Sequence, residues 1–120
     1  MIRFRERIGD VGRWTTEVPV PIPGDPRAID AVLTLERCRC GIEFIMRLHD
    51  CQAQLRPIHL KQRDAQLDRM IVVVPATHAN RRAIHEAGPY LAEAFPLGTR
   101  RILSALTAGL DPGGNGIVLL

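Results

Sequence analysis

The sequence has few aromatic residues, a single lysine and no long apolar run. Aromatic side chains make up 4% of the 120 residues, which argues against a platform on which the bases of single-stranded nucleic acid would stack. No apolar run approaches the roughly 20 residues of a membrane-spanning helix, and the N-terminus "MIRFRERIGD" lacks the apolar core of a signal peptide. Three cysteines, an odd number, fit a reducing compartment better than a disulfide framework. We therefore expect a cytoplasmic protein that makes no membrane contact.

The rest of the composition is that of an ordinary globular protein. Hydrophobic residues make up 46% of the chain and charged residues 24%, and this length suffices for one domain with its own core. The net charge of +3 permits contact with nucleic acid without requiring it. Two interpretations of the arginine clusters stay open, a solvated face or contact with a phosphate backbone. The clusters are Arg3, Arg5 and Arg7, then Arg81 and Arg82, then Arg100 and Arg101.

Hydrophobic periodicity and turn residues predict an α/β domain. Apolar alternation and β-branched runs predict strands over 13–21, 27–35, 39–46, 69–75 and 116–120. Helical spacing predicts helices over 48–63, 78–87, 90–95 and 99–108. Pro57 should kink or split the first helix, and residues 1–13 are either a short helix or a basic lead-in to a single domain over 14–120. The element order predicts a mixed β-sheet flanked by helices.

Two acids interrupt otherwise apolar strands. Asp30 lies within "AIDAVL" and Glu43 within "GIEFIM". If the two strands pair as a hairpin, strand alternation brings both carboxylates to one side of the sheet. Two neighbouring carboxylates repel unless a cation lies between them, and Mg²⁺ is held in proteins by one or two carboxylates and water. The alternative is that both acids pair with arginines at strand ends.

The arrangement resembles a known pattern. An Asp on one strand, then a strand with Glu-x-Lys or Glu-x-Glu, then a helix resembles the PD-(D/E)xK core of restriction-endonuclease-like domains. More closely, four segments over roughly residues 13–120 resemble the C-terminal domain of actinobacterial helix-turn-helix (XRE-type) transcriptional regulators. These segments are "TEVPVPIPGDPRAIDAVL", "GIEFIMRLHDCQAQLRPIHLKQRD", "LDRMIVVVPATHANRR" and "LDPGGNGIVLL".

The resemblance implies a role for each matching residue. Asp30 takes the metal-binding aspartate position, Glu43 the first acid of the Glu-x-(Glu/Lys) pair, and Glu17 the place of an upstream acid. Lys61, with Gln54 on the same helix, would supply the positive charge that the motif lysine usually contributes. Mg²⁺ would be the cofactor of such a site, held by the two main acids.

The chain departs from the pattern in three places. Ile45 occupies the second motif position, where an isoleucine can neither bind metal nor orient water. Pro57 disturbs the helix that would aim the lysine. The regulators carry a helix-turn-helix ahead of this domain, and residues 1–13 are too short to form one. These departures favour a non-catalytic regulatory or assembly domain, whereas the retained acids favour a Mg²⁺- or Mn²⁺-dependent nuclease acting on DNA or RNA.

Two further expectations come from the residues alone. Cysteine and histidine spacing allows a small zinc-binding interaction module, with Cys38, Cys40, His49 and Cys51 as the ligands. The expected edge strands over 13–21 and 116–120 would leave pairing surfaces that proteins usually cover. We therefore expect a homodimer.

Overall fold

The strands pair in the order in which they occur along the chain. The computed structural model describes residues 1–120 and contains one five-stranded sheet with the order β1-β2-β3-β4-β5. β1–β2 and β2–β3 are antiparallel, whereas β3–β4 and β4–β5 are parallel. This confirms the predicted mixed sheet. The strands are β1 (Arg13–Pro19), β2 (Ala28–Thr34), β3 (Arg39–Phe44), β4 (Arg69–Val74) and β5 (Gly116–Leu119).

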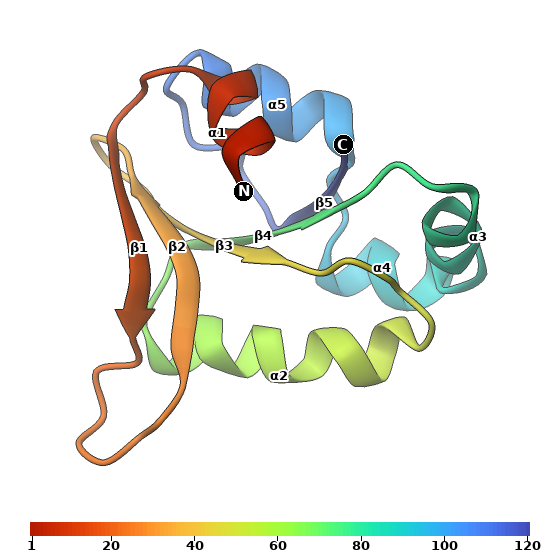
Figure 1. The fold of residues 1–120 in the computed structure, drawn as a ribbon, viewed down its shortest axis with the longest axis horizontal. Helices are drawn as coiled ribbons and strands as arrows, with labels where there is room; N and C mark the ends of the chain where they lie inside the picture. Colours follow the sequence, from red (N-terminus) through yellow and green to blue (C-terminus); the bar gives the residue numbers. More distant parts are fainter.

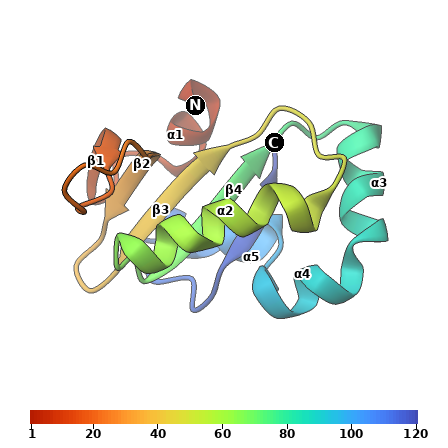
Figure 2. The same ribbon diagram turned by 90° about the horizontal axis from the view of Figure 1, so that it is seen from below.

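Helices cover both faces of the sheet. α2 runs below the sheet across β3 and β4, and α1 and α5 lie together on the opposite face (Figures 1 and 2). α3 and α4 follow β4, and α4 packs into the core on the α2 side. The predicted α/β class is therefore confirmed. The helices are α1 (Ile2–Ile8), α2 (Cys51–Asp64), α3 (His78–Glu86), α4 (Gly88–Ala94) and α5 (Thr99–Thr107).

The sheet separates two hydrophobic cores. Successive side chains of a strand point to opposite faces. Met70, Val72 and Val74 of β4 therefore pack in the core beneath α2, hereafter the α2-side core, whereas Ile71 and Val73 pack in the core beneath α1 and α5, the α5-side core. Burial on both faces agrees with the interior position of β4, between β3 and β5.

The N-terminal residues belong to the domain. The sequence assigned residues 1–13 to a basic lead-in with an open choice of helix, but α1 buries Phe4 and Ile8, which are 1% and 2% exposed, in the α5-side core. Only two apolar side chains of this short segment pack into the core, and two positions are too few for hydrophobic periodicity to predict a helix. None of the helices combines the length and apolar character that crossing a membrane would require.

Pro57 does not break its helix. α2 is continuous from Cys51 to Asp64, with the Asp50 side chain accepting from the Ala53 N–H at its start. The expected split of the helix is therefore wrong. Pro57 lies on the exposed side of α2, where water can bond to the backbone carbonyl that the missing N–H leaves free.

The two edges of the sheet differ. Leu97 forms a parallel bridge to Gly116, with the Leu97 N–H bonded to the Asn115 carbonyl and the Ile117 N–H to the Leu97 carbonyl. This bridge covers part of the outer edge of β5. β1 lies at the other end of the strand order and leaves its outer edge open.

Candidate functional site

Asp30 and Glu43 meet where the backbone ladder between β2 and β3 ends. The last paired residues are Ala31 and Ile42. Beyond them, the Asp30 N–H donates to Glu43 Oε2 at 2.8 Å and the Phe44 N–H donates to Asp30 Oδ2 at 2.9 Å. Each carboxylate thus accepts a backbone N–H of the opposite strand. The prediction that strand pairing brings these acids together agrees with this geometry.

The alternation of side chains along β2 is broken next to Asp30, where the carboxylates and backbone N–H groups of β2 and β3 are hydrogen-bonded. Ile29 and Val32 are three residues apart, yet both pack in the α2-side core, while Ala31 between them packs in the α5-side core. Opposite Asp30, Glu17 of β1 has a left-handed φ of 50° and is omitted from an otherwise regular register. The local irregularity allows the Asp30 carboxylate to turn toward β3.

Lys61 completes the cluster from α2. Its Nζ lies 2.6 Å from Glu43 Oε1. The Glu43 side chain is 5% exposed and the Lys61 side chain 21% exposed. Because α2 continues through Pro57, the last turn of the helix carries the ammonium over β3. Asp30, Glu43 and Lys61 are hereafter the acid cluster.

Burial dominates the ionisation of Glu43. Its pKa is raised above the ordinary value because removal from water disfavours the charged carboxylate. The hydrogen bond from Lys61 and the bond from the Asp30 N–H act in the opposite direction, and the nearby Asp30 charge adds to the increase. Lys61 therefore stabilises a carboxylate that the surrounding core destabilises.

The remaining motif positions do not join the acid cluster. Ile45 donates its N–H to the Val73 carbonyl at 3.1 Å and packs its side chain against the α2-side core, so hydrocarbon stands where the motif has an acid or lysine. Glu17 is exposed and forms no ion pair or side-chain hydrogen bond. The upstream acid suggested by the resemblance therefore does not reach the cluster.

Gln54 does not contact Asp30, Glu43 or Lys61, with which the resemblance placed it. Its Oε1 accepts from the N–H groups of His49 and Asp50 at 2.8 and 3.1 Å, and its Nε2 donates to the Arg47 carbonyl at 2.9 Å. These bonds fix the loop that enters α2. Gln54 is seven residues before Lys61, roughly 10 Å along the helix axis, so its amide is not part of the acid cluster.

The acid cluster has few atoms left for a metal ion. Both Glu43 oxygens and Oδ2 of Asp30 already accept hydrogen bonds, and an ammonium stands beside the pair. No group of three or more His, Cys, Asp or Glu side chains is placed to hold a metal ion. Asp30 and Glu43 are the only acids that Mg²⁺ could share here, and the Lys61 ammonium would lie beside the ion as a competing cation.

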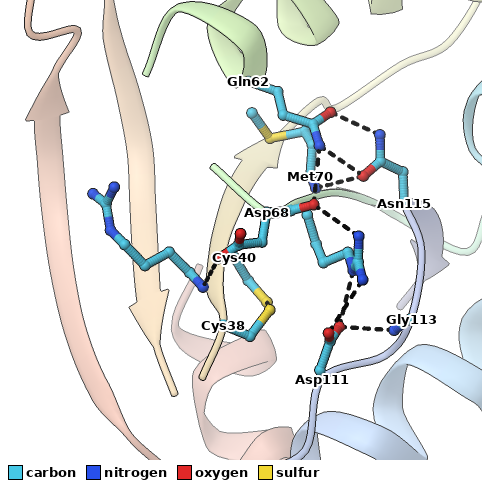
Figure 3. A network of polar contacts seen from close by, with 10 residues as sticks. Cys38, Cys40, Gln62, Asp68, Met70, Asp111, Gly113 and Asn115 are labelled. Atoms are coloured by element: carbon cyan, nitrogen blue, oxygen red, sulfur yellow. Dashed lines mark hydrogen bonds and ion pairs between the residues drawn. The ribbon is translucent and has the colours of Figure 1, made fainter. Parts of the chain in front are cut away.

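The four proposed zinc ligands lie on opposite faces of the sheet. Cys38 and Cys40 are buried in the α5-side core with their Sγ atoms 3.5 Å apart (Figure 3). Cys51 lies in the α2-side core and donates to the Ala83 carbonyl, while His49 is exposed. A common tetrahedral site is therefore not formed. Burial also raises the pKa of the Cys38 and Cys40 thiols, which keeps them protonated.

Two asparagines have structural roles that the sequence did not reveal. Asn115 exchanges two amide hydrogen bonds with Gln62 and accepts from the Met70 N–H at 2.8 Å (Figure 3). Asn80, 1% exposed, accepts from the Leu48 N–H and donates to the carbonyls of Met46 and Pro75. Asn115 lies in "DPGGNG", a typical turn sequence, and its partners Gln62 and Met70 are distant in the sequence, so no local pattern indicates its role.

An apolar hollow lies at the carboxyl ends of β3 and β4. Its volume is about 230 Å³, and eight of its ten lining residues are hydrophobic, among them Phe44, Ile45 and Val74. Arg3 is its only charged lining residue. Asp30, Glu43 and Lys61 are absent from the lining, so this hollow is separate from the acid cluster.

Comparison with known proteins gives no relative. No protein-family model, no curated protein and no solved structure matches the chain. The resemblance to the C-terminal domain of XRE-type regulators stays a prediction from the sequence.

Proposed function

We propose that this chain is a non-catalytic regulatory or assembly domain of restriction-endonuclease-like architecture with a degenerate nuclease-type site. The observation that carries the proposal is the set of contacts within the acid cluster. Lys61 pairs with Glu43 at 2.6 Å, and each acid accepts a backbone N–H of the opposite strand. The charges that a nuclease would direct at metal and substrate are used here between β2, β3 and α2.

The chemistry of phosphodiester cleavage supports the same conclusion. A metal-dependent nuclease needs acids that fix the ion and a further group that positions the attacking water. Ile45 offers no such group, and Gln54 is occupied by the loop before α2. Losing one contact to the transition state commonly lowers the rate by about 10² to 10³-fold. We expect the chain to lack appreciable cleavage activity.

A cleavage assay tests this proposal. The chain is incubated with plasmid DNA and with a structured RNA in the presence of Mg²⁺ or Mn²⁺, beside Asp30→Ala, Lys61→Ala and the exposed control Asp10→Ala. We expect no metal-dependent product from the wild type. Robust cleavage that survives in Asp10→Ala and disappears in both cluster variants, with folding verified by circular dichroism, would overturn the proposal.

The second candidate is a Mg²⁺- or Mn²⁺-dependent nuclease. It is favoured by the meeting of Asp30 on β2, Glu43 on β3 and Lys61 on α2, which is the order implied by the motif. A resident metal would stabilise the folded state by mass action. Thermal unfolding without Mg²⁺ and at Mg²⁺ concentrations raised in 10-fold steps separates the two candidates. A rise in Tm with Mg²⁺ in the wild type that is absent in Asp30→Asn would support the nuclease.

Assembly would use the open edge of β1. A second copy of the chain could add there, because Leu97 already covers part of the β5 edge and unpaired strand edges favour such pairing. We therefore propose a homodimer. Sedimentation at high micromolar concentration should give twice the 13.4 kDa monomer mass, and a monomer alone would contradict this part of the proposal.

A further inference from the structure

A groove separates α1 from α5 on the face of the sheet opposite the acid cluster. The two helices contact each other, and the groove between them has a volume of about 630 Å³. Arg7 of α1 lines it from one side, and Thr99, Arg100, Ser104 and Thr107 line it from α5. A smaller hollow along α1 contains Arg3 and again Arg7. Together these form the α1–α5 groove.

The helical spacing places the basic groups in a row. Arg3 and Arg7 are four residues apart and therefore lie on one side of α1, and Arg100 extends the row onto α5. All three are exposed, and none takes part in an ion pair. Glu6, in the smaller hollow, has the only acidic side chain among the lining residues. The groove thus concentrates positive charge that the protein does not neutralise itself.

Hydroxyl groups line the groove beside the guanidinium groups. Ser104 and Thr107 are exposed on α5. Thr99 accepts from the Leu119 N–H at 2.9 Å through its Oγ1, so the hydroxyl proton remains available for donation. Arginine, serine and threonine side chains are typical donors to the phosphate oxygens of nucleic acids.

The groove lacks the features that read bases. No aromatic side chain is among its lining residues, so unstacked bases would find no platform. Guanidinium and hydroxyl donors suit a regularly spaced row of phosphates. We propose that the α1–α5 groove binds the phosphate backbone of a nucleic-acid duplex without sequence preference, with Arg7 and Arg100 as the main contacts and Arg3 extending them.

Salt-dependent binding measures this interaction directly. Anisotropy of a labelled 20-base-pair DNA duplex is followed as the chain is titrated at about 50 and 200 mM salt. Three phosphate contacts give a slope of about −2.7 in log affinity against log salt, so the affinity should fall roughly 40-fold between these conditions. The same titration with an RNA duplex shows which nucleic acid supplies the backbone.

A matched pair of double variants locates the site. Arg7→Ala/Arg100→Ala should reduce the magnitude of the salt slope by about 2, because each phosphate contact contributes roughly one unit. Arg56→Ala/Arg81→Ala removes the same charge from exposed arginines without ion pairs on α2 and α3, and should leave the slope nearly unchanged. Arg7→Lys/Arg100→Lys should retain it, since the charge is kept.

Each other outcome overturns the inference. An equal reduction of the salt slope in the two double-alanine variants would indicate general charge attraction rather than a defined site. Binding to inorganic phosphate or to anionic lipid vesicles, without binding to either duplex, would indicate a different ligand. Absence of duplex binding at low salt would refute the proposal that the α1–α5 groove binds nucleic acid. The cleavage assay does not decide this question, because the acid cluster lies on the α2 face of the sheet.

Discussion

Replacement of Lys61 by methionine tests what holds the acid cluster together. The change removes the ammonium, keeps an apolar stem, and leaves the nearly buried Glu43 carboxylate without its cation. Removing one partner of a buried ion pair typically costs about 3–5 kcal/mol. Because 21% of the Lys61 side chain is exposed and the Asp30 N–H still bonds to Glu43, we expect a loss of about 2 kcal/mol at pH 7.

Urea unfolding followed by far-UV circular dichroism measures this loss. With an m-value of about 1–3 kcal/mol/M, a loss of about 2 kcal/mol lowers the midpoint by roughly 1 M. Arg63→Met is the matched control on the same helix. Its side chain is 71% exposed and pairs with Asp64 at the surface, so its effect should stay below about 1 kcal/mol.

The pH dependence gives a second signature. The pKa of Glu43 is raised in the folded protein, so its contribution to stability is fully present below the ordinary value of 4.5 and falls as the pH rises through the folded pKa. Lys61→Met removes a contact that lowers this pKa and therefore raises it further. The difference between wild type and variant should shrink as the sample is acidified toward the ordinary Glu range.

A double variant completes the test. Lys61→Met/Glu43→Gln replaces the isolated carboxylate by a neutral amide whose oxygen can still accept from the Asp30 N–H. It should recover much of the stability lost in Lys61→Met at pH 7. The reasoning is refuted if the single variant loses the same free energy at pH 4.5 as at pH 7 and the double variant recovers nothing.

Three other predictions concern the fold. Gly116→Ala should lower Tm by roughly 5–10 °C, because the new methyl would overlap a backbone carbonyl oxygen, whereas Gly114→Ala meets only ordinary contacts and should change Tm little. Asn80→Ala should cost about 3 kcal/mol in urea unfolding, since it leaves buried backbone groups unpaired. Arg27 lowers the pKa of Asp25 to about 2, so stability should fall as the pH drops from 3.8 toward 2, and Asp25→Asn should remove that component of the midpoint's pH dependence.

Local patterns predicted most of the secondary structure. "RMIVVV" has β-branched residues on both faces and forms the interior strand β4. The helix expected over 78–87 is α3, and Thr77, directly before it, caps it by accepting from the Asn80 N–H. The split expected at Pro57 does not occur. Pro57 and Ala53, whose carbonyl loses its usual N–H partner, are both exposed, so water can bond to that carbonyl, and such exposure is a property of the folded chain.

The acid cluster was only partly predictable. Strand pairing was enough to bring Asp30 and Glu43 together, since the connection between β2 and β3 is short. Whether Lys61 reaches them depends on how α2 packs on the sheet, and its sequence spacing does not determine that. Gln54 occupies a neighbouring helical position, but the N–H groups of the preceding loop engage its amide. Hydrogen bonds of this kind, between a helix side chain and a nearby loop, cannot be predicted from the periodicity of the sequence.

The position of Trp14 makes the docking of α1 optically observable. Trp14, the only tryptophan of the chain, lies on β1 with its ring 6.2 Å from that of Phe4 and 5.6 Å from the Arg5 guanidinium of α1. A seven-residue helix is unstable in isolation, so α1 depends on this packing. Indole emission would therefore change when α1 alone leaves the sheet, and the spectroscopic signal would distinguish fraying of the N-terminal helix from unfolding of the whole domain.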